Sequence, residues 1–182
     1  MHDAITIYFN GEKNAGLFIA AIGAAIVVAA LVLFRARADF RSFALTLGIV
    51  ALVEIAIGVG LYLRTDPQVG RLLGQFDSSP SSFYRDEHAR MVRVQRNFVV
   101  IEYVEVALIV VTAIVAIARK SNATLTGVAL GLLINAALLL AFDLIAERRG
   151  AAYLAEIERG ATSDFRLKTS DFRLQTSNFP KA

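Results

Sequence analysis

Four long apolar runs alternate with polar segments along the chain, at residues 15–34, 43–63, 98–118 and 123–146. At a rise of about 1.5 Å per residue, a helix of about twenty residues crosses a hydrocarbon layer about 30 Å thick. A backbone surrounded by lipid must satisfy its own hydrogen bonds, so each run is predicted to be a helix. The pattern therefore predicts an all-α protein built as a four-helix transmembrane bundle.

The polar connections between the runs differ in length. The first and third are short, so the helices that they join are predicted to form antiparallel hairpins. The middle connection, 64–96, is long and contains its own helix signals. Asp66 and Pro67 suit a helix start, and an apolar stripe at helical spacing follows, formed by Val69, Leu72, Leu73 and Phe76. We expect an amphipathic middle loop at the membrane surface, then a long third helix that starts near Pro80.

A heptapeptide repeat occupies the end of the chain. Its three copies are TSDFRLK, TSDFRLQ and TSNFPKA, and they begin at Thr162. Each copy lacks the two apolar positions that a coiled coil requires, so a flexible tail is predicted. The chain is thus divided into a four-span bundle at 1–160 and a repeat tail at 161–182.

Composition narrows the chemistry that this bundle supports. The chain has no cysteine, and its two histidines, His2 and His88, lie outside the apolar runs. Thiolate metal sites and a haem held by two histidines inside the bundle are therefore excluded, and we expect no cofactor, no metal and no catalytic residue. The formal net charge is +3, with basic residues flanking the runs. This distribution favours contact with the lipid bilayer and indicates no nucleic acid partner.

Polar side chains interrupt three of the four runs. They are Glu54 in the second, Glu102 and Glu105 in the third, and Asn135 and Asp143 in the fourth. By helical rise, Glu54 lies near the middle of the bilayer, and the other acids lie in the half nearer the two termini. A carboxylate that faces lipid is costly, so these groups are expected to face the interior of the bundle. Together they form the candidate buried polar or ion site.

Two interpretations of this candidate site remain open. In the structural interpretation, the carboxyl groups carry a proton or pair with basic residues near the membrane boundary, and the possible charge partners are Lys13, Arg64, Arg96 and Arg148. In the functional interpretation, they serve as oxygen ligands or relay groups for a cation or a proton. A di-metal oxidase is not favoured, because its paired Glu-x-x-His ligands are missing from the sequence.

Three stretches carry a resemblance to known proteins. They are YFNGEKNAGLF at 8–18, ARMVRVQRNFVVIEYVEVAL at 89–108 and DLIAERRG at 143–150. Over residues 5–155 the chain resembles a group of small bacterial four-span membrane proteins with no assigned activity. The resemblance implies a bacterial inner-membrane location and identifies no functional residue.

These observations predict a non-enzymatic integral membrane protein that acts as a scaffold or an accessory subunit. The alternative is a small oligomeric channel or an ion- or proton-coupled transporter that uses the buried carboxyl groups. In either case we expect a homo-oligomer or a complex with another membrane protein. Basic residues are more numerous on the side that bears both termini, so both termini are predicted to be cytoplasmic.

Overall fold

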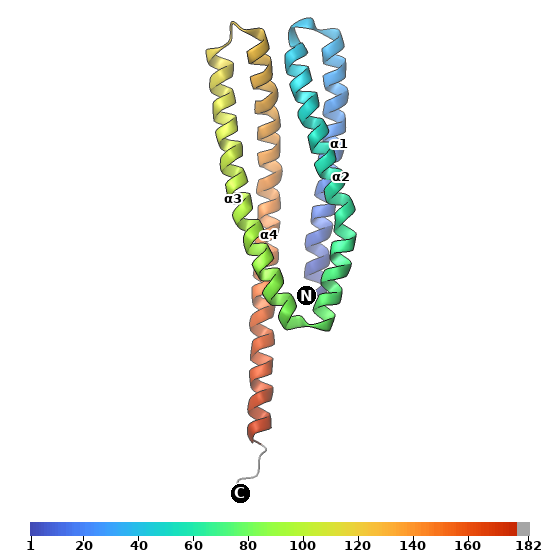
Figure 1. Ribbon diagram of the computed structural model, residues 1–182, viewed down its shortest axis with the longest axis vertical. Helices are drawn as coiled ribbons and strands as arrows, with labels where there is room; N and C mark the ends of the chain where they lie inside the picture. The colour runs from blue at the N-terminus through green and yellow to red at the C-terminus, as the bar shows by residue number, and fades with distance from the viewer. Residues whose placement is uncertain (178–182) are drawn as a thin grey trace.

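Four long helices make up the computed structural model, which describes residues 1–177 and the side chains of 1–164 and 166 (Figure 1). A short 3-10 helix joins the first two. In chain order the elements are α1 (His2–Ala36), η1 (Ala38–Phe40), α2 (Arg41–Ser78), α3 (Pro80–Ala118) and α4 (Ala123–Ser177). The prediction of an all-α fold is confirmed.

The helices are arranged as two antiparallel hairpins that stand side by side (Figure 1). One hairpin is α1 with α2, and the other is α3 with α4; most contacts between helices lie within these pairs. Contact between the hairpins is made mainly by α2 and α4. Near the end that bears the short connections, a side chain at Gly127 would collide with Ser42 and Phe43, so α4 and α2 are in close contact there.

The structure corrects the prediction of an amphipathic middle loop. Instead of a separate surface helix, its first half is the continuation of α2, which runs through Pro67 to Ser78. The apolar stripe explains this continuation, because its side chains pack against α1 and α3 and not against lipid. The ring of Phe76 lies 5.2 Å from that of Phe83 on α3 and 5.4 Å from that of His2 on α1, centroid to centroid. Packing of the stripe therefore extends the helix beyond the proline.

The long third helix is confirmed. It begins at Pro80 and continues to Ala118. Proline is favourable at the start of a helix, because its missing N–H costs no hydrogen bond there. The preceding Ser79 makes no side-chain capping bond. Because the apolar run begins only at residue 98, the first turns of α3 project beyond it.

The last helix is much longer than its apolar run. α4 continues to Ser177, and the structure thus has helix through most of the repeat where the sequence analysis expects a flexible tail. The remaining residues of the predicted tail, 178–182, lie outside the described residues.

Glycines bring the two helices of the first hairpin into backbone contact. A Cβ atom at Gly16 would lie 2.7 Å from the carbonyl oxygen of Gly58, and one at Gly23 would lie 3.0 Å from the carbonyl oxygen of Ala51. Real Cβ atoms essentially never approach as closely as the first distance, and the second is tighter than nine in ten real Cβ contacts, so glycine at both positions permits the close approach. Small residues that let helices approach this closely are typical of helix pairs in membranes.

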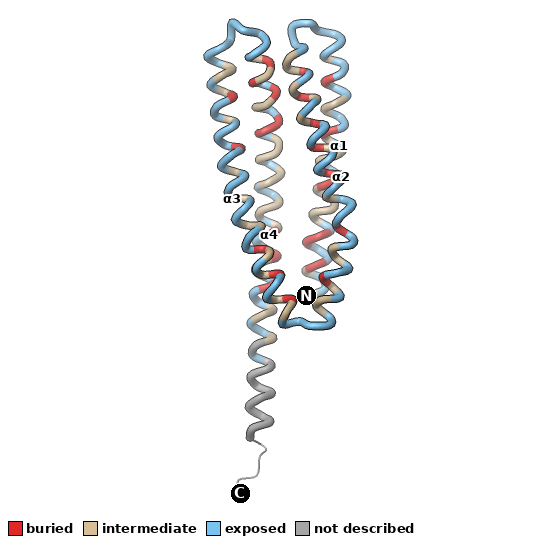
Figure 2. Tube along the Cα trace, viewed as in Figure 1, coloured by how far each residue is buried: buried red, intermediate tan, exposed pale blue. Residues whose placement is uncertain are grey.

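A cluster of buried hydrophobic residues lies outside the apolar runs, at the end of the molecule that bears the N-terminus. We name it the outer cluster, and its buried members are Ile5, Tyr8, Phe9, Leu72, Phe83, Met91, Tyr153 and Ile157. Every one of the four long helices contributes to it. Figure 2 shows buried positions along the facing sides of the helices and a mostly exposed outer surface.

Candidate functional site

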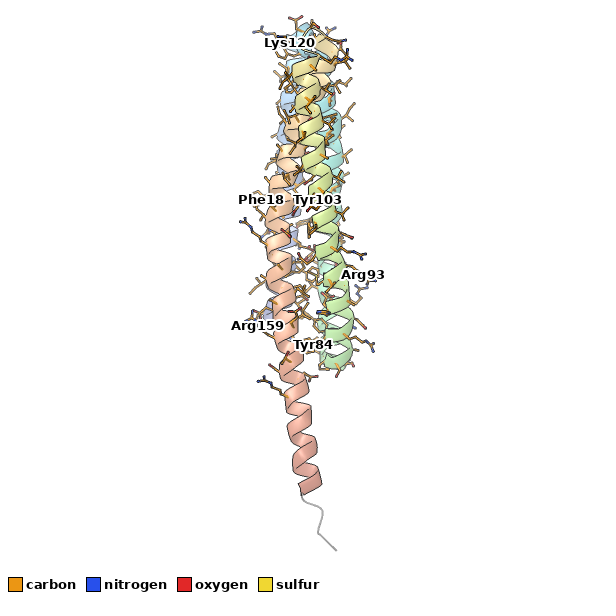
Figure 3. The ribbon with its side chains drawn as sticks, turned by 90° about the vertical axis from the view of Figure 1, so that its left-hand side faces the viewer. Phe18, Tyr84, Arg93, Tyr103, Lys120 and Arg159 are labelled. Atoms are coloured by element: carbon orange, nitrogen blue, oxygen red, sulfur yellow. The ribbon has the colours of Figure 1, made fainter. Side chains whose placement is uncertain are left out.

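The apolar runs expose large hydrophobic side chains on all four helices. Phe18 on α1 is 65% exposed and Tyr103 on α3 is 74% exposed, and both project from the outside of the molecule in Figure 3. Such a continuous apolar surface is not stable against water. All four helices are long and apolar enough to cross a membrane.

Three of the predicted site residues meet between α3 and α4. Glu105 is buried, and its carboxyl group lies close enough to those of Asp143 and Glu102 to interact electrostatically. Glu102 also interacts with Glu147, a residue that the sequence analysis did not include. Oε2 of Glu105 and Oε1 of Glu102 are buried with no hydrogen-bond partner among the described residues. The structure therefore gathers carboxyl groups of like charge at this point between the two helices.

Glu54 lies apart from this group. Its side chain on α2 is 2% exposed, and Oε1 is buried with no hydrogen-bond partner among the described residues. Asn135 on α4 is also buried; its Nδ2 donates to the carbonyl oxygen of Gly131, 2.9 Å away, while its Oδ1 has no partner in the described part of the chain. The structure thus brings together Glu102, Glu105 and Asp143, and it leaves Glu54 without them.

The predicted charge partners do not pair with these acids. Lys13 binds Asp66, with Nζ 2.6 Å from Oδ2, and lies over the ring of Tyr62. Arg64, Arg96 and Arg148 are exposed and form no ion pair within residues 1–164. These three arginines lie near the ends of the apolar runs, where long basic side chains reach the headgroup layer.

Replacement of Glu54 by methionine tests whether this carboxyl group supports the fold. The side chains are similar in size, and the change removes a buried oxygen that has no hydrogen-bond partner among the described residues. Such a group costs about 1–3 kcal/mol, so the free energy of unfolding is expected to rise by about that amount. The measurement is thermal unfolding of both proteins in the same detergent. A marked loss of stability would show that Glu54 holds a partner that stabilises the fold.

A second polar site, which sequence reasoning missed, lies in the outer cluster. Glu87 on α3 is 3% exposed, and both of its carboxylate oxygens accept hydrogen bonds from Arg90, each at 2.7 Å. The hydroxyl of Tyr153 on α4 donates to Glu87 at 3.1 Å. Arg90 also lies over the ring of Phe9 on α1, 5.6 Å from its centroid. One ion pair therefore links α3 to both α1 and α4.

The aromatic hydroxyls of this cluster are held as donors. Tyr8 and Tyr153 stack with 4.5 Å between ring centroids, and Tyr8 donates to Glu12 at 2.7 Å. Burial raises the pKa of the Tyr153 hydroxyl, and the nearby Glu87 carboxylate raises it further. Tyr153 therefore stays protonated at physiological pH.

A sequence signal for this cluster exists. Phe83, Glu87 and Met91 recur every four residues on α3, which places all three on one helix face. From residues 83–96 the sequence analysis singled out only His88 and Arg96, and it did not consider that a glutamate between two apolar residues on the same face is itself buried.

Neither site has the composition of a metal or nucleophilic centre. Among the described residues, no group of three or more histidine, aspartate or glutamate side chains is placed to hold a metal ion. The acids between α3 and α4 interact electrostatically, whereas the Glu87–Arg90 pair is suited to joining helices.

Comparisons with known proteins return no relative. No family model, no curated protein and no solved structure matches the chain. The fold itself defines the class: four helices long and apolar enough to cross a membrane indicate a multi-pass integral membrane protein.

Proposed function

We propose that this protein is a non-enzymatic membrane protein that acts through assembly, as a scaffold or an accessory subunit in a bacterial inner membrane. The observation that carries the proposal is the large apolar surface exposed on all four helices. Part of such a surface faces lipid, and helix surfaces of this kind also associate with other helices. The partner is a second copy of the chain or another membrane protein.

The packing inside the first hairpin supports assembly over conduction. Gly16 and Gly58 bring the backbones of α1 and α2 together, which leaves no room for a passage between these helices. A groove farther along the same pair of helices has a volume of about 220 Å³. Its lining consists of apolar residues and one glycine, and it includes Val27, Leu31 and Ile49. A path for ions requires polar groups along its length.

The orientation that we propose has both termini in the cytoplasm. The first turns of α1 and the last described turns of α4 lie toward the same end of the molecule (Figure 1). On that side lie Lys13, the arginines of the 64–96 segment, and Arg148, Arg149 and Arg159. The excess of basic residues favours the cytoplasmic side.

The alternative is a small oligomeric channel or an ion- or proton-coupled transporter. The observation that favours it is the set of interacting carboxyl groups between α3 and α4, together with the buried Glu54. Buried acids inside membrane helices are frequent in ion and proton pathways.

Purified protein in liposomes distinguishes the two functions. Under the proposed function, wild type and Glu54→Gln give the same background level of cation and proton flux. Where the partner is a second copy, the wild-type particle also has a mass of more than one 19.7 kDa chain. Flux that is present in wild type and in the surface control Glu156→Gln but lost in Glu54→Gln would establish the transport alternative. A monomer that remains alone in bilayer nanodiscs would contradict self-assembly.

A further inference from the structure

A cavity of about 520 Å³ opens between the first turns of α1 and the middle of α4. It lies beside the outer cluster and outside the apolar runs. Ile7, Ala152 and the ring of Tyr8 form part of its apolar wall, while Arg149 and Arg159 supply positive charge. The cavity therefore combines apolar surface with guanidinium groups.

Arg149 is the unusual member of this lining. Its Nε is buried with no acceptor among the described residues, and within residues 1–164 it forms no ion pair. The side chain lies against the backbone of α1, because a Cβ atom at Gly11 would lie 3.2 Å from Arg149 Cδ. A buried donor on a charged group is costly when it has no partner, and a bound anion would supply an acceptor for this guanidinium.

The acidic residues of the cavity do not supply that anion. Glu156 is already bound by Arg159, with Oε1 2.6 Å from Nη2. Asp3 lies eight residues before Gly11 on α1, which is about 12 Å along the helix axis. Both acids thus belong to the end of the cavity that is farther from Arg149.

The position of Arg149 along α4 places it at the depth of lipid headgroups. It follows the end of the fourth apolar run by three residues, or about 5 Å. Gly11, which it touches, precedes the first apolar run by four residues, or about 6 Å. The polar layer on each side of a bilayer is about 5–8 Å thick, so Arg149 lies within that layer.

We infer that Arg149 binds the phosphate of one glycerophospholipid, whose headgroup occupies this cavity between α1 and α4. A guanidinium presents parallel N–H donors that match two phosphate oxygens. Ile7 and Ala152 lie farther from the apolar runs than Gly11 and Arg149 do, so they contact the part of the headgroup beyond the phosphate. The carboxylates at the far end of the cavity disfavour a lipid with several phosphates, so the ligand carries one phosphate. This inference rests on the proposed membrane location.

Native mass spectrometry of the full chain tests the site. The protein is stripped of lipid in a neutral detergent and titrated with phosphatidylglycerol, and the bound fraction is counted. Arg149→Gln is expected to weaken binding about tenfold, which is the loss of one charge-assisted contact. Arg148→Gln is the matched control, since it removes the same charge from an exposed neighbour that does not line the cavity; it should bind lipid as wild type does.

Three results would overturn the inference. The first is an equal loss of lipid binding in Arg149→Gln and Arg148→Gln, which would mean that binding depends only on net charge. The second is displacement of the lipid by inorganic phosphate at concentrations similar to that of the lipid, which would identify a site for free phosphate. The third is unchanged binding in Arg149→Gln. Should that variant fail to fold, Arg149→Lys keeps the charge without the paired donors, and the inference then requires weaker binding than wild type.

The failure of this inference is distinguishable from the failure of the proposed function. Alkaline extraction of membranes releases proteins that are not integrated. Wild-type protein in the released fraction would contradict the membrane location itself. Protein that stays in the membrane while Arg149→Gln binds lipid normally would contradict only the headgroup site.

Discussion

Replacement of Arg90 by alanine is expected to lower the free energy of unfolding by about 3–5 kcal/mol. The reason is that Glu87 is 3% exposed and receives two of its hydrogen bonds from Arg90. Without the guanidinium, the buried carboxylate keeps the hydroxyl of Tyr153 as its one donor in the described part of the chain. The contact between Arg90 and the ring of Phe9 is lost as well. Thermal and denaturant unfolding in detergent measures the change.

Arg93→Ala provides the matched control for this prediction. Arg93 lies one turn farther along α3, is exposed, and forms no ion pair within residues 1–164 (Figure 3). Its replacement should change stability by less than about 0.5 kcal/mol. The double variant Glu87→Leu/Arg90→Met removes both charges and should recover most of the stability. Equal effects of Arg90→Ala and Arg93→Ala would show that the ion pair does not stabilise the fold.

Replacement of Gly58 by valine is expected to separate α1 from α2. A Cβ atom at this position would contact the carbonyl oxygen of Gly16 and lie 2.8 Å from the backbone nitrogen of Ala20. Backbone atoms cannot move aside as a flexible side chain does, so the helices must shift. Overpacking of this kind costs about 1–3 kcal/mol, and more where backbone is involved. The measurements are thermal stability and the yield of a disulfide between cysteines introduced on the two helices.

The control for Gly58→Val is Gly60→Val. Gly60 lies in the same helix two residues away, and no other atom lies within 4 Å of a Cβ atom built there. The two variants share the change in helix propensity, and they differ only in the contact with α1. A similar fall in stability and in cross-linking for both would mean that the close contact between the helices is unimportant.

The sequence predicted the helices better than the neighbours of their side chains. Helix α2 shows the difference: Asp66 and Pro67 are ordinary signals for a new helix, but the stripe that ends at Phe76 packs on α1 and α3 and keeps the helix continuous. A local signal could not reveal this, because the surface that covers Phe76 comes from residues that are distant in the chain.

The acidic residues show the same limit. Their depth follows from counting residues along each run, and depth placed Glu54 near the middle of the bilayer and the other acids in the half nearer the termini. Whether two of them touch depends on the rotation of each helix about its axis and on its register against its neighbour. The structure rotates Glu105 and Asp143 toward one another and leaves Glu54 on a different helix without either of them.

The amino-acid sequence by itself determined that this protein has four apolar helices and which residues form the apolar run of each. Hydropathy and helical rise are properties of a local stretch of chain. Only the tertiary structure decided that Lys13 binds Asp66, that Arg90 joins Glu87 beneath Tyr153, and that Arg149 faces a cavity. Those outcomes depend on which helix faces approach one another, and it is the packing of whole helices that selects the faces.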